Sequence, residues 1–148
     1  MHILIVEDSD FNAFCLKRLL ESVHQKIQIT TVNDSVNALQ ACENQTFDAI
    51  IIDGDLGAGN GLCCNGAALA DAIWSKYPQQ TLISWTDSDF WRNAFAEVFK
   101  QYQKPFNDNY CWPKVVSYDR IRKLLSHSTS ITNKKRAAAI DNYSDTAQ

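Results

Sequence analysis

The sequence has no long apolar run and no strong excess of charge of one sign. Its 148 residues carry a formal net charge of -3, and 45% of them are hydrophobic. A helix that spans a bilayer needs about 20 consecutive apolar residues, and domains that bind nucleic acid carry a marked positive patch. We therefore expect a protein whose partners include neither a membrane nor a nucleic acid.

The cysteine patterns of zinc sites are also missing. The five cysteines include no C-x-x-C pair and no histidine at zinc-ligand spacing. Reduced, mostly buried thiols are expected, and only the adjacent Cys63 and Cys64 leave an opening for redox chemistry. The first apolar stretch, His2 to Val6, is too short and too soon acidic for a signal peptide. These features favour a cytoplasmic protein.

Short apolar runs alternate with stretches of helical periodicity along the chain, as is typical of a parallel sheet with crossover helices. The predicted strands cover residues 3–6, 27–32, 47–52, 81–85 and 99–103. Right-handed crossovers then predict a three-layer, flavodoxin-like, doubly wound α/β fold with the strand order 2-1-3-4-5. Residues 1–126 are expected to form this domain, and the polar residues 127–148 a flexible tail.

The carboxyl-terminal part of this domain is predicted to contain two more helices. A short helix is expected around residues 89–98, before the fifth strand. The last helix is predicted to carry Pro113 in its first turn. Its buried residues are expected to be Val115, Val116, Ile121, Leu124 and Leu125.

Polar side chains follow four of the five predicted strands. They are Glu7 and Asp8 after the first strand, Asp53 and Asp55 after the third, Thr86 after the fourth, and Lys104 after the fifth. Ligands of such sheets bind at the carboxyl ends of the strands. Carboxylates gathered there repel one another unless a cation neutralises them, and an all-oxygen set with room for water suits Mg²⁺.

This arrangement predicts phosphoryl-transfer chemistry. Asp53 is expected to act as a carboxylate nucleophile that forms an acyl phosphate. Lys104 and the metal would cancel charge on the transferring group, and Thr86 would offer its hydroxyl to a phosphoryl oxygen.

Four motifs, each ending a predicted strand, resemble the receiver domain of two-component response regulators. They are Ile-Leu-Ile-Val-Glu7-Asp8, Phe47-Asp48-Ala-Ile-Ile-Ile-Asp53, Ser84-Trp85-Thr86 and Gln103-Lys104-Pro105-Phe106. The resemblance covers about residues 1–126. It implies that Asp53 accepts phosphate from a histidine kinase or a phosphotransfer protein.

The resemblance also implies roles for the neighbours of Asp53. Glu7, Asp8 and Asp53 would hold Mg²⁺ together with the backbone carbonyl of Asp55. Lys104 would contact the phosphoryl group, and Thr86 would relay the change.

Several positions depart from the receiver pattern. Leu56-Gly57 stands where receivers commonly carry Met-Pro, and the following loop is longer than usual. Asp87 follows the threonine, where a small residue is usual; its carboxylate would repel a phosphoryl group, or point away as a helix cap. Gln101 stands in place of the aromatic residue expected three positions before the lysine, and the span from Thr86 to Lys104 leaves little room for a helix.

No DNA-binding module is expected beyond residue 126, so a stand-alone receiver that signals to a downstream protein effector by direct contact is the leading hypothesis. One alternative is a receiver-like adaptor that does not switch, marked by Asp87 and Gln101. A second is a phosphatase in which Asp53-Gly54-Asp55 serves as a D-x-D nucleophile motif, with Asp55 as general acid.

Overall fold

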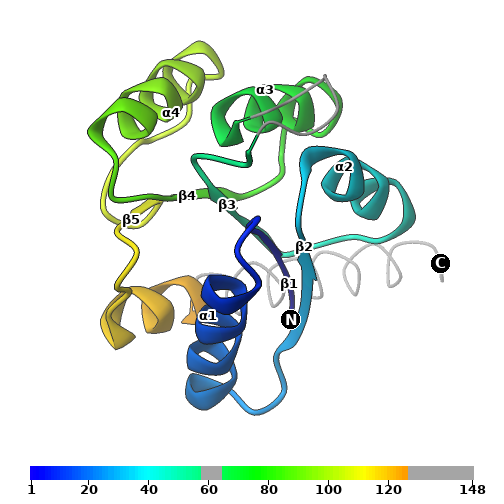
Figure 1. Cartoon of the computed structure of the whole chain (residues 1–148), viewed down its shortest axis with the longest axis vertical. Coiled ribbons are helices and arrows are strands. Elements are labelled where there is room, and N and C mark those ends of the chain that lie inside the picture. The colour runs from blue at the N-terminus through cyan, green and yellow to red at the C-terminus, as the bar shows by residue number, and fades with distance from the viewer. Residues whose placement is uncertain (58–64, 127–148) are drawn as a thin grey trace, which may run out of the picture.

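The computed structural model describes residues 1–57 and 65–126, so the expected tail and Cys63 and Cys64 lie outside the described residues. Within the described part, five parallel strands form one sheet with the order β2-β1-β3-β4-β5, which confirms the predicted fold (Figure 1). The strands are β1 (His2–Val6), β2 (Gln28–Val32), β3 (Ala49–Asp53), β4 (Leu82–Trp85) and β5 (Cys111–Trp112). The helices are α1 (Asp10–Val23), α2 (Ser35–Asn44), α3 (Gly66–Lys76) and α4 (Asp89–Gln101), and residues 118–126 are also helical.

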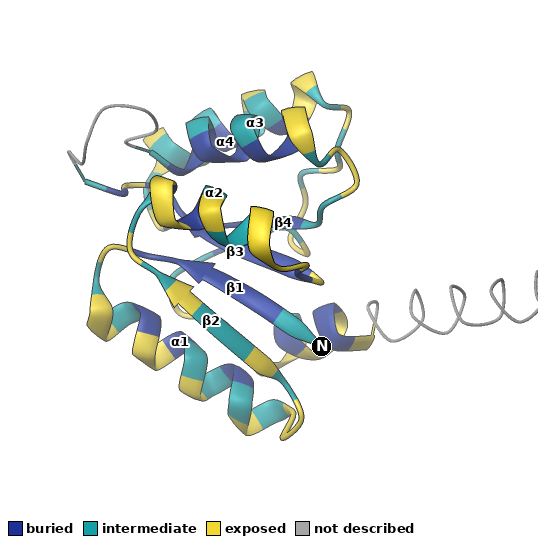
Figure 2. Ribbon diagram, turned by 90° about the vertical axis from the view of Figure 1, so that its right-hand side faces the viewer, coloured by how far each residue is buried: buried dark blue, intermediate teal, exposed yellow. Residues whose placement is uncertain are grey.

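The sheet lies between two layers of helices. Helices α2, α3 and α4 cover one face, and α1 and the helix at 118–126 cover the other (Figures 1 and 2). Along β1 and β3 successive side chains alternate between the two cores: Leu4 and Ile50 pack towards α3 and α4, and Ile3 and Ile51 pack towards α1. Both faces of these strands are therefore buried, which explains their unbroken apolar runs.

Each helix from α1 to α4 begins at a polar residue that caps it. The side chains of Ser9, Asp34, Asn65 and Ser88 each accept a hydrogen bond from a backbone N–H in the first turn of the helix that follows. Such a cap typically contributes about 1 kcal/mol to the stability of a helix. The caps at Ser9 and Ser88 each lie three residues after the last residue of a strand, which leaves short loops at the carboxyl edge of the sheet.

The predicted strand at 99–103 is wrong, because α4 continues to Gln101. Phe95 and Phe99 lie one turn apart and are both buried in the core under α3 and α4. The helix then ends in a Schellman-type cap, in which the N–H of Lys104 donates to the carbonyl of Phe99 at 2.8 Å and Gln103 has a φ of 56°. The Lys-Pro pair therefore terminates a helix and not a strand.

The fifth strand is the two-residue β5, which follows later in the chain. It pairs with β4 through Ser84 with Cys111 and Trp85 with Trp112. The chain then passes through a turn, and the helix begins only at residue 118, so the predicted start at Pro113 is also wrong. Val115 is 87% exposed, against the prediction. The other residues expected in this core are buried: Val116, Ile121, Leu124 and Leu125.

Candidate functional site

Three carboxylates meet at the carboxyl ends of β1 and β3. Glu7, Asp8 and Asp53 each place an oxygen within 4.8 Å of the other two. The cause is the register of two adjacent parallel strands, in which Val6 pairs with Ile52, so the next residue along each, Glu7 and Asp53, reaches the same edge. Glu7 and Asp53 are 1% and 7% exposed, and Asp8 is exposed to solvent.

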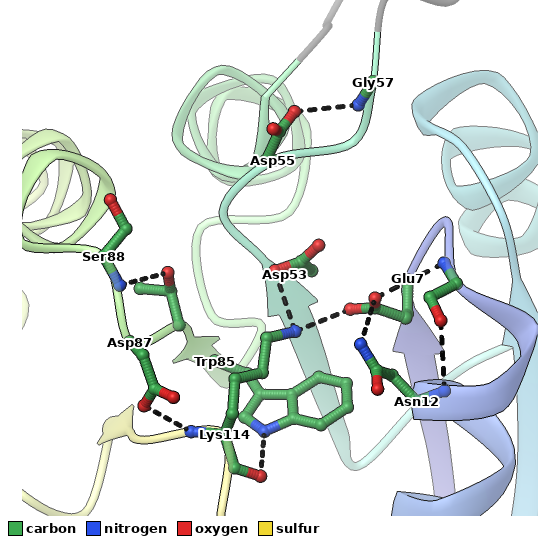
Figure 3. Close-up of polar contacts among 11 residues, drawn as sticks. Glu7, Asn12, Asp53, Asp55, Gly57, Trp85, Asp87, Ser88 and Lys114 are labelled. Atoms are coloured by element: carbon green, nitrogen blue, oxygen red, sulfur yellow. Dashed lines mark hydrogen bonds and ion pairs between the residues drawn. The ribbon is translucent and has the colours of Figure 1, made fainter.

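Asp53 is a buried carboxylate held by one ammonium group. Its Oδ1 lies 2.9 Å from Nζ of Lys114, and its other oxygen points away from that ammonium (Figure 3). Burial raises the pKa of Asp53 to about 6; Lys114 opposes this shift and the charge of Glu7 adds to it. At neutral pH the group is ionised and more basic than an ordinary aspartate, as suits a nucleophile.

Glu7 is fixed by the first turn of α1 and by the same ammonium. Its Oε1 accepts from the backbone N–H of Ser9 and from Nδ2 of Asn12, each at 3.3 Å. Its Oε2 accepts from Nζ of Lys114 at 2.7 Å. Lys114 therefore bridges the two buried carboxylates (Figure 3).

Lys104 does not reach this site, so the prediction that it contacts the phosphoryl group is wrong. Its Nζ donates to the carbonyl of Pro78 at 2.6 Å and lies 5.6 Å from the ring centre of Trp74. Pro78 precedes β4, at the opposite edge of the sheet from Asp53. The place expected for Lys104 is taken by Lys114.

The sequence carried two signals for Lys114. The span from Thr86 to Lys104 was too short for both a helix and a strand. Further along the chain, the apolar pair Cys111-Trp112 is followed at once by a proline and a lysine, Pro113-Lys114. The order of Lys and Pro there is the reverse of that at 104–105, so a search for Lys-Pro does not find it.

Thr86 directly follows β4, whose last residue, Trp85, pairs with Asp53. It is 4% exposed, and its Oγ1 accepts a hydrogen bond from the backbone N–H of Ser88 at 3.1 Å. A Cβ added to Gly54 would lie 3.2 Å from that oxygen and 2.6 Å from Cβ of Trp91. Glycine after Asp53 thus lets Thr86 and the first turn of α4 approach the backbone at residue 54 closely.

The carboxylates of Asp55 and Asp87 are directed at backbone groups. Asp55 Oδ1 accepts from the N–H of Gly57 at 3.0 Å, and Asp87 Oδ1 accepts from the N–H of Lys114 at 2.9 Å (Figure 3). Gly57 has a φ of 74°, a conformation that glycine adopts readily. Neither carboxylate is turned towards Asp53, so Asp87 acts as a hydrogen-bond acceptor for the turn that carries Lys114.

The donor set of the site fits Mg²⁺. Three carboxylates and one ammonium leave a formal charge of -2 when all are ionised, which one divalent cation balances. The ligand atoms are all oxygens, and Asp8 lies on the solvent side, where water can complete an octahedral shell.

The sequence profile described as the response regulator receiver domain matches residues 3–109 and stops short of Lys114. No curated protein sequence matches the chain. In the part of the chain that the structure describes, no helix has the length and apolar character that a membrane crossing requires.

Solved receiver structures share the fold. A CheY-like receiver domain protein from Methanospirillum hungatei JF-1 is 18% identical with a TM-score of 0.65, over 93% of this chain and 97% of that one. The receiver domain of NtrX from Brucella abortus is 17% identical with a TM-score of 0.62, over 85% and 96%. A longer NtrX structure from Brucella abortus is 16% identical with a TM-score of 0.65, and there the match covers 93% of this chain but 29% of that one.

Proposed function

The chain belongs to the response regulator receiver domain family, and we propose that it is a response regulator that accepts a phosphoryl group on Asp53. Receiver domains of this family serve phosphorelay signalling. One observation carries the assignment of the acceptor. Asp53 is a buried carboxylate, paired with Lys114 and next to two further carboxylates, at the edge of the sheet where ligands bind.

In the proposed reaction a carboxylate oxygen of Asp53 attacks the phosphorus of a phosphohistidine. The O–P bond forms as the P–N bond breaks, and the imidazole leaves with its electron pair and takes up a proton. Glu7, Asp8, Asp53 and the backbone carbonyl of Asp55 would hold Mg²⁺, which when bound would neutralise charge on the phosphoryl oxygens. Lys114 stays within reach of both buried carboxylates and balances the charge that the phosphoryl group brings.

Thr86 is the proposed relay from the phosphoryl group to α4. Its hydroxyl oxygen now accepts from the N–H of Ser88, and Ser88 caps α4 through the N–H of Trp91. When the hydroxyl turns to donate to a phosphoryl oxygen, this loop loses one of its fixed contacts. The start of α4 is then the element whose position depends on phosphorylation.

The proposed partners are a histidine kinase or phosphotransfer protein as donor and a downstream protein effector. Exposed apolar side chains near the site support a protein contact: Phe11 and Phe14 on α1 are 73% and 58% exposed, and Val115 is 87% exposed. A cavity of about 320 Å³ between α1 and the Lys114 turn extends this surface. We propose a cytoplasmic protein that acts as a phosphoacceptor, with neither nucleic acid nor a membrane among its partners.

The test is the intact mass of the purified chain after incubation with acetyl phosphate and Mg²⁺. We expect the wild type to gain one phosphoryl group, and Asp53→Asn and a sample with chelator to gain none. An equal gain in Asp53→Asn would contradict the assignment. A wild type that binds Mg²⁺ but gains no phosphoryl group, even from a phosphorylated phosphotransfer protein, would favour the adaptor that does not switch.

A further inference from the structure

Lys114 is held by three contacts from the end of β4. Its backbone N–H donates to Oδ1 of Asp87 at 2.9 Å, and its carbonyl accepts from Nε1 of Trp85 at 3.2 Å. Its Nζ lies 3.7 Å from the ring centre of Trp85. Figure 3 shows that Trp85 and Asp87 form hydrogen bonds with the backbone of Lys114, while its side chain reaches Asp53 and Glu7.

The turn that carries Lys114 lies between Trp112, which is buried and accepts from the N–H of Thr86 at 3.0 Å, and the buried Val116. The strand before it is only two residues long, and Val115, the next residue along, is 87% exposed. A lysine side chain also has many rotamers, and ordering it opposes any contact that it makes. The ammonium nonetheless lies within 3 Å of both buried carboxylates, at 2.7 Å from Glu7 and 2.9 Å from Asp53.

Trp85 is itself held firmly in the sheet, so its contacts can fix Lys114. It is 3% exposed and ends a central strand, where it pairs with Asp53 of β3 on one side and with Trp112 of β5 on the other. A cation over an indole face is stabilised by the ring quadrupole, more so where water is excluded. The ring therefore helps to hold the ammonium in its place 2.9 Å from Oδ1 of Asp53.

We propose that Trp85 and Asp87 are positioning residues of the phosphoacceptor site, which act by holding Lys114 so that its ammonium meets Asp53. This inference rests on the proposed function of Asp53 and Lys114. It gives Asp87 a role opposite to repulsion of the phosphoryl group, because its carboxylate is engaged by the backbone of the lysine.

The first test compares rates of phosphorylation by acetyl phosphate with Mg²⁺ in the full chain. Asp87→Ala should slow the reaction at least about tenfold, because a displacement of about 1 Å at a reacting centre can cost a hundredfold. Asp87→Asn keeps an oxygen acceptor and should recover most of that loss. The matched control is Asp89→Ala, which removes an exposed carboxylate that pairs with Arg92 and should react at the wild-type rate.

A second arm separates positioning from general damage to the fold. In a Lys114→Ala background there is no ammonium to position, so Asp87→Ala should then have little further effect. An equal slowing in both backgrounds would overturn the inference. Asp87→Ala at the wild-type rate, with Lys114→Ala slow, would overturn it while leaving the proposed function intact; phosphorylation that persists in Asp53→Asn would instead contradict the function.

A third readout needs no phosphorylation. Trace acetylation of lysine amines, followed by peptide mass analysis, reports how far Lys114 is protected relative to the exposed Lys76. Asp87→Ala and Trp85→Phe, which keeps a ring but loses the indole N–H, should both label Lys114 at least about threefold faster, since each loses a hydrogen bond to the backbone of Lys114. Unchanged labelling in both variants, with thermal unfolding showing folded protein, would overturn the inference.

Discussion

Asp53→Asn is predicted to stabilise the folded protein in the absence of Mg²⁺. The pKa of Asp53 rises from 3.8 to about 6 on folding, chiefly because the carboxyl is buried. A shift of that size means that the ionised group lowers the free energy of unfolding by about 3 kcal/mol at pH 8. Asparagine keeps an oxygen that can accept from Lys114 but carries no charge. The variant therefore does not bury an ionised group on folding.

The sign of the pH dependence follows from the raised pKa. Well below pH 3.8 the carboxyl is neutral in both the folded and the unfolded chain, and the wild type carries no penalty. The penalty grows as pH rises from about 4 to 6 and is complete above the folded-state pKa. Asp53→Asn should therefore unfold about 10 °C higher than the wild type at pH 8, taking roughly 3 °C per kcal/mol for a chain of this size, and the difference should shrink towards zero near pH 4.

The assay is thermal unfolding followed by circular dichroism, with chelator present, across pH 4 to 8. Asp8→Asn is the matched control, because its carboxylate belongs to the same cluster but is exposed, and it should change the unfolding temperature much less. Added Mg²⁺ should stabilise the wild type more than Asp53→Asn. A variant no more stable than the wild type at pH 8, or a gap that widens on acidification, would refute the reasoning.

Two further predictions concern residues packed against Asp53. Gly66→Ala should lower the free energy of unfolding by about 3 kcal/mol or abolish folding in urea titrations, because the added Cβ would lie 2.1 Å from the backbone oxygen of Asp53; an unchanged midpoint would refute this. Glu7→Gln should lower the pKa of Asp53 from about 6, because the charge of Glu7 helps to raise it. Carboxyl-carbon NMR titration measures this directly, and a higher pKa in the variant would contradict the electrostatic account.

The acidic half of the site could be predicted from the sequence because it depends only on adjacent strands. Continuous apolar runs identified β1 and β3, and parallel pairing brings together the polar residues that follow these apolar runs, whatever the loops do. Glu7, Asp8 and Asp53 therefore meet as predicted. Thr86 was predicted in the same way, because it follows β4, the strand next to β3.

The cationic half could not be predicted in the same way because the fifth strand has almost no sequence signal. Two residues, Cys111 and Trp112, are too few for a periodicity. Phe99 and Tyr102 fit the spacing of a helix, but the short segment around them also reads as an alternating strand, and Lys-Pro is a common end for either. Tertiary packing of α4 on α3, through Trp74 and Phe99, favours the helix over the strand in this segment.

In the proposed reaction Asp53 works with Lys114 and not with Lys104. The most direct measurement is the rate at which Lys114→Ala and Lys104→Ala gain a phosphoryl group from acetyl phosphate with Mg²⁺, each checked for folding by thermal unfolding. We predict a loss of about a hundredfold in Lys114→Ala, typical of removing one group that stabilises developing charge, and a rate within about twofold of wild type in Lys104→Ala, which only anchors the end of α4 at Pro78. A slow Lys104→Ala beside a normal Lys114→Ala would contradict the account.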